Sequence, residues 1–553
     1  MPTLSHGNVS YDKRTVGGIV TFSCHNGFEL VGPETKTCKE KGNRFRWSPR
    51  RPITKCQSKR SEPSITTEPS AETLQAPNIV IVIADALGYN DVGFRNPKFV
   101  TPVIDTLSKE GIRLDNYYVE AFATGFRASL MTGKYFPNTG SMAFIQNAVD
   151  NCVPHDELNL AERLQRVGYS TSFIGKWQMG YSRTSCLPRN RGFDYFYGLD
   201  FWENDEPVLD ADGEFGTDLI TSKAIERIEM QDDDKALFLT VAYETRKPAN
   251  PPEEYKNKII DIPDGKLGPL KSPRKDFAAM VNAVDTGLGK IIQKLKDKDL
   301  WENTVLLFTP DKGGNKNVQN NWPLRGAGMN YFEGRIRGLG ILAGAITHGG
   351  KGKDLPKPYS GLIHMTDWYR TFLSLAKADI GNSGVDSYDV WNSIRVSKPS
   401  PRTEILHSLN PEIPRLGSPL YPDTFDSSIQ AAIRIEKYKL LTGRIYYNGA
   451  YGGWVAPAEY PELVTVEPDL NDTSNVHLYN IKDDPEEKIE LSSKMPNKVK
   501  EMLDRLKELQ PLTKPEPYPC PDPVGAPALV SEGANDSPED DVYAWKPWIV
   551  DTK

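Results

Sequence analysis

No hydrophobic run in this 553-residue chain approaches the roughly 20 apolar residues that a membrane-spanning helix needs. The first ten residues, MPTLSHGNVS, lack an apolar signal core, so we expect that any secretory signal was removed or never included. Six cysteines without a CxxC pair and seven histidines without a metal-binding spacing argue against zinc. We therefore expect neither a transmembrane segment nor a zinc site.

Acidic residues are scarce at the N-terminal end. Residues 1–60 hold 12 Lys and Arg against 4 Asp and Glu, a net charge of +8. Because the whole chain carries −7, the remainder must carry −7 − 8 = −15. Eight of the cations are crowded together: Lys36, Lys39, Lys41, Arg44, Arg46, Arg50, Arg51 and Lys55. An anionic polymer would bind such a patch with strong salt dependence, and a solvated surface is the alternative.

The chain divides by composition and by hydrophobic pattern. Residues 58–76, SKRSEPSITTEPSAETLQA, lack an apolar period and are typical of a linker. After them, continuous apolar runs such as PNIVIVIAD and ALFLTVAY alternate with helix-period stretches such as 277–295, which predicts an α/β fold with a mostly parallel sheet. A strand-like run at 431–443 and an amphipathic helix at 496–509 indicate a C-terminal α+β subdomain. The expected divisions are 1–57, 58–76, 77–400 and 401–553.

The N-terminal segment contains the pattern GGIVTFSCHNGFELVGPETKTC…RWSPRRPITKC. It resembles a sushi (complement control protein) domain, a small β-module stapled by disulfides, which implies an oxidising compartment. The resemblance implies four cysteines, and three are present: Cys24, Cys38 and Cys56. The first would fall at or before Met1, through either truncation or loss. A Cys24–Cys56 bridge is expected in both cases.

Six segments of the remaining chain occur in the order and spacing found in sulfatases: PNIVIVIADALGYNDVGF, RASLMTGKY, GKWQMGYSRTSCLPRNRGFDYFYG, FTPDKGGN, NNWPLRG and EGRIRGLG. From residue 77 to the final VYAWKPWIV the chain resembles the sulfatase family, and the arylsulfatase B group in particular. The resemblance implies an alkaline-phosphatase-like α/β sandwich with a C-terminal α+β subdomain.

The resemblance also implies a site in which hydrated formylglycine, made from a cysteine, attacks a sulfate ester. Calcium polarises the sulfate, lysines hold it, and histidines move protons. Four of the implied side chains are kept: Asp85, Arg127, Lys176 and Asp311. Six positions are changed: Ala86, Ala123, Gln178, Arg246, Lys312 and Gly328.

The changed positions remove the reacting groups. Ala123 stands where the formylglycine cysteine is expected, and Gly125 replaces a proline of the same motif. Gln178 and Arg246 stand in place of the two histidines, and Gly328 in place of a sulfate-binding lysine. No modifying enzyme can make an aldehyde from alanine. We therefore expect a pseudoenzyme without sulfatase activity.

The expected calcium site is also degraded, because Ala86 and Lys312 replace two of its ligands. Calcium takes six to eight oxygens, and two carboxylates beside an ammonium group make a poor site. Lys312 is a candidate to occupy the cation's place, and no cofactor is expected. Asp85 and Asp311 have an alternative role in capping helices or pairing with Arg127 and Lys312, and Lys176 has one in a buried ion pair.

Three replacement functions remain open. The first is a secreted binder of a sulfated glycan or other polyanion. It would bind through the basic residues 1–60, which we name the basic head, and through the former active-site pocket, whose assigned side chains have a net charge of +2. The residues assigned to that pocket are Asp85, Arg127, Lys176, Arg246, Asp311 and Lys312. The second is a carrier of a small organic ligand in a roomier pocket, with Phe126, Trp177 and Met179 nearby in sequence. The third is an extracellular matrix protein. Nucleic acid is not an expected partner.

The resemblance implies one disulfide in the body, Cys152–Cys186. Ala148 replaces another family cysteine, which leaves Cys520 without its usual partner. A Cys38–Cys520 link, two free thiols and an intermolecular bond are the alternatives. Three sequons predict glycosylation in a secreted protein: Asn8, Asn471 and Asn535.

Overall fold

The computed structural model describes residues 76–514 and 516, apart from gaps at 142–149, 155–157, 199–201, 209–212, 246–249, 264–272, 317, 349–357, 382–383, 446–450 and 470–471. It also describes backbone strands within residues 7–58 and 528–544. The chain divides into two compact units, residues 1–74 and 75–553. Each unit is described separately.

The N-terminal unit is built from short antiparallel strands. Four form a sheet in the order β1-β2-β4-β5, and β3 pairs with β6. Their bounds are β1 Gly7–Tyr11, β2 Ile19–Cys24, β3 Phe28–Val31, β4 Thr35–Lys41, β5 Arg44–Ser48 and β6 Lys55–Ser58. The three cysteines lie on β2, β4 and β6, and the expected Cys24–Cys56 bridge lies outside what is described of these strands.

The second unit is organised around a nine-stranded sheet in the order β13-β12-β11-β10-β14-β7-β15-β16-β8. The five strands from β11 to β15 are mutually parallel, and β12, β13, β16 and β8 pair antiparallel at the edges. The strands are β7 Asn78–Ala84, β8 Ile112–Leu114, β10 Ser170–Gly175, β11 Tyr195–Gly198, β12 Trp202–Glu203, β13 Glu206–Pro207, β14 Leu237–Tyr243, β15 Thr304–Pro310 and β16 Gly340–Ala343. The predicted α/β fold is confirmed, but the sheet is mixed, because only its five central strands are mutually parallel.

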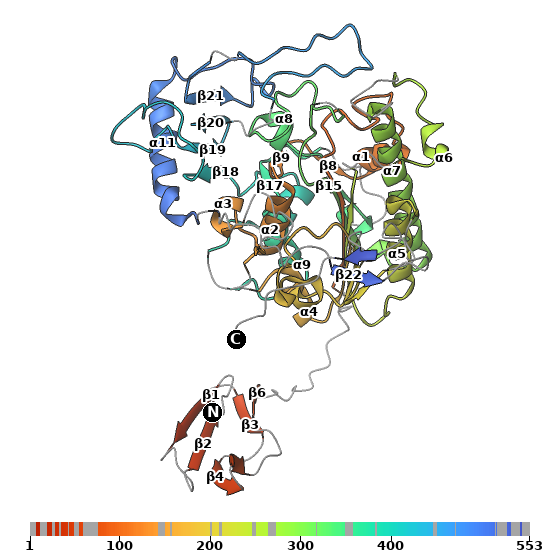
Figure 1. Ribbon diagram of the computed structural model, residues 1–553, viewed down its shortest axis with the longest axis vertical. Coiled ribbons are helices and arrows are strands. Elements are labelled where there is room, and N and C mark those ends of the chain that lie inside the picture. Colours follow the sequence, from red (N-terminus) through yellow and green to blue (C-terminus); the bar gives the residue numbers. More distant parts are fainter. Residues whose placement is uncertain are drawn as a thin grey trace. The chain divides into compact units, whose positions relative to one another are not determined.

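Helices cover both faces of this sheet (Figure 1). Because side chains alternate along a strand, Ile79, Ile81 and Ile83 of β7 pack in one apolar layer, and Val80 and Val82 pack in the other. The first layer includes α2 Ala123–Thr132, α4 Leu160–Arg166, α9 Asp367–Leu375 and α10 Trp391–Arg395. The second includes α1 Pro102–Glu110, α5 Gly216–Glu229, α6 Glu253–Lys256 and α7 Pro273–Asp297. The central strands are therefore buried on both faces.

A four-stranded antiparallel sheet, β18-β19-β20-β21, forms the C-terminal subdomain with α11 Pro496–Leu509. Its strands are β18 Glu404–Asn410, β19 Gln430–Ile435, β20 Tyr438–Thr442 and β21 Val476–Asn480. The strand expected at 431–443 is thus a hairpin, because Glu436 adopts a left-handed φ of 51° between β19 and β20. The remaining elements are α3 Phe136–Thr139, α8 Glu333–Ile336, β9 Tyr117–Tyr118, β17 Ile363–His364, β22 Ala528–Ser531 and β23 Val542–Ala544.

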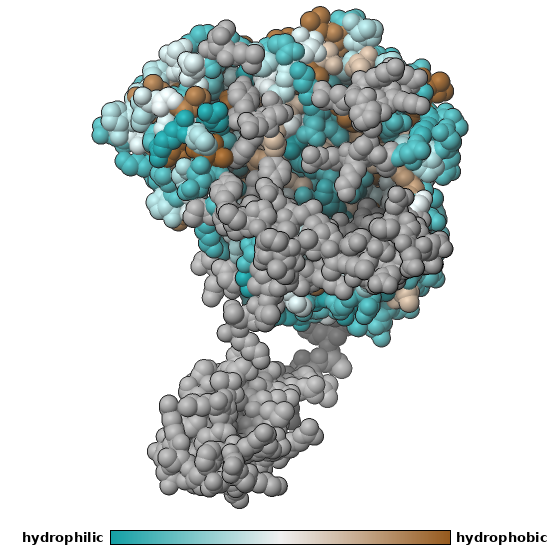
Figure 2. Space-filling model, viewed as in Figure 1, coloured by the Kyte–Doolittle hydropathy of each residue, from teal (hydrophilic) through white to brown (hydrophobic). Residues whose placement is uncertain are grey.

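The face of the molecule in Figure 2 is largely hydrophilic where residues are described, with hydrophobic residues in small separate groups. Ile260, Val464 and Leu512 are among the exposed apolar side chains, and they come from segments far apart in sequence. Among the described helices, none combines the length and apolar character needed to cross a bilayer.

Candidate functional site

Four neighbouring parallel strands deliver polar side chains at their carboxyl ends. Asp85 follows β7, Lys176 follows β10, Glu244 follows β14, and Asp311 and Lys312 follow β15. Ligands of open α/β sheets bind at this edge. The sheet therefore brings together residues separated by more than 200 positions, as the sequence predicts.

Lys312 lies between the two carboxylates of this edge. Its Nζ donates a hydrogen bond to Asp311 Oδ1 at 2.9 Å and another to Asp85 Oδ1. The Lys312 side chain is 3% exposed, and both aspartates are fully buried. Of the two alternatives, helix capping and ion pairing, the geometry selects ion pairing.

Arg127 reaches one of these carboxylates, Asp311, from α2. Its Nη1 donates to Asp311 Oδ2 at 2.9 Å and to the carbonyl of Ala123, one helical turn earlier, at 3.0 Å. Its Nε donates to the carbonyl of Lys176 at 2.9 Å. The remaining nitrogen, Nη2, is buried and has no hydrogen-bond partner among the described residues. An unsatisfied buried donor of this kind is costly, so this atom is suited to an acceptor that the described residues do not supply.

Lys176 is the most accessible cation of the group. Its Nζ donates to Asp85 Oδ2 at 2.8 Å and lies 3.6 Å from Glu244 Oε1, and its side chain is 16% exposed. Sequence reasoning missed Glu244, although it lies only two positions before Arg246. With Glu244 included, three described cations face three carboxylates. The charges of these six residues therefore balance, whereas the expected net charge of +2 also counted Arg246, which lies outside the described residues.

The ion pairs shift the pKa values of their members. Burial would raise the pKa of Asp85, but the ammonium groups of Lys312 and Lys176 outweigh it and hold that pKa below its ordinary value. Burial lowers the pKa of Lys312, against the opposing effect of Asp311 and Asp85. The pKa of Lys176 is raised, because the attraction of Asp85 and Glu244 exceeds the effect of burial.

These residues do not fit the calcium ion that the sequence resemblance implies. Each of the four carboxylate oxygens of Asp85 and Asp311 already accepts a hydrogen bond from a lysine or arginine side chain. Asp311 Oδ1 accepts a second one, from the backbone N–H of Ala86 at 2.9 Å. Calcium needs six to eight free oxygens, and an ammonium group cannot supply one. Within the described residues, no group of three or more Asp, Glu, His or Cys side chains could hold a metal.

The other changed positions carry no reacting group. Ala123 is the first residue of α2 and presents only a methyl group. Ala86 and Gln178 adopt left-handed φ values of 57° and 51°, and Gln178 Oε1 is buried with no hydrogen-bond partner in the described part of the chain. Gly328 has a φ of 76°. At Gly125, a Cβ would lie 3.2 Å from the Phe136 ring, so Phe136 packs closely against the backbone here.

The apolar residues considered as a pocket lining lie in the core instead. Phe126, Trp177 and Met179 belong to the layer packed between the sheet and α2, α4 and α9. Trp177 also donates its Nε1 hydrogen to the carbonyls of Gly180 and Cys186, at 3.1 and 3.2 Å. This arrangement removes their support for an organic-ligand pocket.

Cys152 and Cys186 form a disulfide, with Cα atoms 5.8 Å apart. Because Trp177 donates to the Cys186 carbonyl, the bridge braces the loop that follows Lys176. Cys520 and the three sequon asparagines lie outside the described residues, apart from the backbone of Asn8 on β1.

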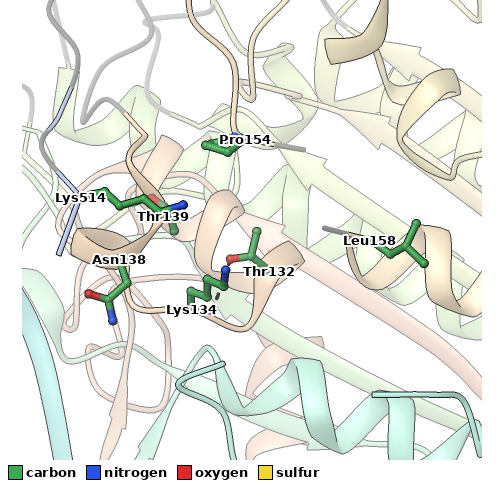
Figure 3. Close-up of a pocket in the computed structure, with 7 residues that line it drawn as sticks. All are labelled: Thr132, Lys134, Asn138, Thr139, Pro154, Leu158 and Lys514. Atoms are coloured by element: carbon green, nitrogen blue, oxygen red, sulfur yellow. Dashed lines mark hydrogen bonds between the residues drawn. The ribbon is translucent and has the colours of Figure 1, made fainter. Parts of the chain in front are cut away.

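A shallow hollow lies at the opposite end of α2 from Ala123 (Figure 3). Its lining consists of Thr132, Lys134, Asn138, Thr139, Pro154, Leu158 and Lys514. Because α2 separates this hollow from the ion pairs, it is not the site that the sequence predicts.

Comparison with known proteins agrees with this architecture. The family model for sulfatases matches residues 77–378, and the model for the sushi (SCR) repeat matches residues 1–56. Arylsulfatase J of Mus musculus is 33% identical over 82% of this chain and 79% of its own length. An ulvan-active sulfatase of Formosa agariphila is 31% identical over 43% of this chain and 50% of its own length. The crystal structure of Ps i-CgsB in complex with k-i-k-neocarrahexaose superposes with a TM-score of 0.65, 25% identity, and coverage of 81% of this chain and 96% of that one.

Proposed function

Because the chain belongs to the sulfatase family and carries an N-terminal sushi repeat, we propose that it is a family member without sulfatase activity. The observation that carries this proposal is the Lys312 ammonium, which is bonded to both Asp85 and Asp311. A lysine supplies positive charge but offers no open coordination position to polarise a sulfate oxygen. The nucleophile and its proton donor are missing too, because Ala123 and Gln178 stand in their places.

Turnover and metal dependence test this proposal. With small aryl sulfates, the purified chain should release no more product than buffer, with or without calcium. Treatment with EDTA should leave its melting temperature unchanged, since an ion that does not bind cannot stabilise the fold. Ala123→Cys alone should remain inactive. Turnover that follows the purified protein, together with a stabilising effect of calcium, would show that the site has been misread.

We further propose that the former active site binds an anionic group, with a sulfated saccharide as the ligand class. The Nη2 of buried Arg127, which no described residue bonds, supports this role, because a guanidinium nitrogen forms strong hydrogen bonds with sulfate oxygens. The names of two similar proteins, an ulvan-active sulfatase and a structure with bound neocarrahexaose, support a saccharide. The balanced charges of the described residues predict modest affinity.

Inorganic sulfate and a sulfated monosaccharide are the appropriate probes, because both are too small to require the basic head. Either should raise the melting temperature of the full chain, and Arg127→Lys should abolish that shift while keeping a cation near Asp311. Phe94→Leu, a change away from the site, is the control. If neither probe shifts the wild-type protein and native mass spectrometry finds a neutral co-purifying molecule, the organic-carrier function replaces this one.

Secretion is also part of the proposed function. The Cys152–Cys186 bridge and the sushi repeat are typical of proteins that fold in an oxidising compartment. Peptide mapping of the natural protein should find N-glycans at Asn8, Asn471 or Asn535. If none of the three asparagines carries a glycan and Cys152 and Cys186 are reduced, these results would argue for an intracellular protein. A matrix role would instead appear as extracellular retention that neither sulfate nor salt displaces.

A further inference from the structure

The strand register of the N-terminal unit sorts its charged residues onto one face. β4 and β5 pair antiparallel, with Lys39 opposite Arg46 and Lys41 opposite Arg44. Directly opposed residues share a face of a sheet, and so do alternate residues along a strand. The register therefore places all four cations together, in a group that we name the basic face.

Residues with hydroxyl groups continue the basic face across the sheet. The register places on it Ser10, Thr21, Ser23, Thr35, Thr37 and Ser48. Ile19 is the one large apolar residue among the strand positions of this face, and none of those positions is acidic. Glu40, the acidic residue of β4, is opposite Phe45 and therefore belongs to the other face. The cations on β4 and β5 thus have no acidic neighbour on their own side of the four strands.

The aromatic residues of the same sheet lie on the opposite face. Tyr11, Phe22, Phe45 and Trp47 all occupy positions of the other parity. Single-stranded nucleic acids bind proteins through stacking on aromatic side chains, and membrane surfaces bind bulky apolar ones. The basic face offers neither, so its composition favours a hydrophilic polyanion.

We propose that the basic face binds a linear sulfated polysaccharide. Opposed residues lie about 5 Å apart and alternate residues about 7 Å apart, so the four cations form a compact quadrilateral. Arg and Lys pair with sulfate oxygens, and neighbouring hydroxyl groups can bond to sugar hydroxyls. β5 is an edge strand of the sheet, and Asn8, the sequon asparagine that shares this face, lies on β1 at the opposite edge, so a glycan there and the four cations occupy different edges. This inference deepens the proposed function but rests on the sushi repeat rather than on Arg127.

Charge-matched variants of the full chain test the proposal. The first replaces the basic face: Lys39→Gln, Lys41→Gln, Arg44→Gln and Arg46→Gln. The control removes an equal number of positive charges from other positions within residues 1–60: Lys36→Gln, Arg50→Gln, Arg51→Gln and Lys55→Gln. Lys36 is opposite Val20 on the other face of β4, and Lys55 is on β6 of the second sheet. Binding to immobilised heparin is measured over a range of salt concentrations, with circular dichroism as the folding check.

The basic-face variant should bind heparin at least about tenfold more weakly near physiological salt, where exposed charges still act over about 8 Å. Its slope of log affinity against log salt should fall by about 3 to 4, as for four lost ion contacts. The control variant should lose much less heparin affinity, and its salt slope should fall much less. Equal losses in the two variants would overturn the proposal, because net charge alone would then explain binding. Tighter binding to duplex DNA or phosphatidylserine vesicles than to heparin would overturn the choice of partner. Neither outcome affects the sulfate-dependent stabilisation through Arg127.

Discussion

At the scale of single residues, Lys312 has the largest consequence in the second unit. Its ammonium bridges two fully buried carboxylates, Asp85 and Asp311, and without it one of the three carboxylates of the site would lack a balancing cation. Buried ion pairs contribute little net stability compared with an apolar replacement. Removal of one partner is different, because it leaves an uncompensated charge in the interior.

Lys312→Met should therefore lower the free energy of unfolding by about 3–5 kcal/mol. Urea unfolding monitored by fluorescence measures the loss. Lys316→Met is the control, because Lys316 is 39% exposed and lies 3.7 Å from Glu467 in a surface pair, worth at most about 1 kcal/mol. Adding Asp85→Asn to Lys312→Met should restore part of the stability. A loss below about 1 kcal/mol in the single variant would mean that the ion pair does not neutralise the site.

The buried carboxyl group of Glu120 should make the free energy of unfolding depend on pH. Burial raises its pKa from 4.5 to about 8, although the hydroxyl of Ser129 donates to Oε1 at 2.9 Å. The folded state therefore holds a proton that the unfolded state has released. This stabilising contribution is complete below pH 4.5 and is lost as the pH rises through about 8.

Glu120→Gln should remove that dependence, because an amide stays neutral and can still accept from Ser129. The variant should match the parent protein near pH 4 and exceed its unfolding free energy at pH 9 by a few kcal/mol, on the order of 4. Unfolding in urea at both pH values gives the comparison, and Glu110→Gln at the exposed end of α1 should behave as the parent does. An equal difference at both pH values would exclude a titrating Glu120.

At the scale of elements, the strands of the sheet were predictable and one hairpin was not. Continuous apolar runs such as residues 78–84 can be stable only when covered on both faces, so they indicate central strands. In the C-terminal subdomain the turn at Glu436 and Lys437 has no Gly, Pro, Asn or Asp. Without a turn residue, the pattern of 431–443 is indistinguishable from one long strand.

The members of the candidate site could be predicted, but their pairing could not. Motifs place Asp85 and Asp311 at strand ends, and the parallel sheet makes strand ends neighbours. Each pairing of a cation with a carboxylate depends on the directions of two side chains that are far apart in sequence. Lys312 and Asp85, for example, are separated by 227 positions. Glu244 escaped notice because it occupies no motif position, yet its charge reduces the expected surplus of +2 to +1.

The Cys152–Cys186 bridge joins two loops at the edge of the first helical layer. Its partners are separated by 34 residues, a loop for which cross-linking stabilises the fold by about 3–4 kcal/mol in the chain-entropy account. Cys152→Ser with Cys186→Ser should therefore lower the melting temperature, measured by differential scanning calorimetry. Trp177 fluorescence should change as well, since its indole donates to the Cys186 carbonyl. An unchanged melting temperature would assign the bridge no structural role.

At the scale of the whole molecule, the division into units 1–74 and 75–553 predicts a cleavage pattern. Lys59 and Arg60 lie in the segment that composition identifies as a linker, and trypsin cuts after both residue types. Brief digestion of the full chain should first release a fragment that begins near residue 60 or 61. Edman sequencing or mass spectrometry identifies it. First cuts within residues 273–297, which form α7, would contradict the division.

The stabilisation that a metal ion gives a fold depends on the concentration of free ion in solution, whereas the Lys312 ammonium is part of the chain. Its effective concentration at the two carboxylates is set by the backbone and does not depend on the surroundings. The strand ends of such a protein cannot be stripped by chelators or exchanged for a competing ion. The fold should therefore form equally well in compartments whose calcium levels differ by orders of magnitude, including any through which the chain passes before reaching its destination.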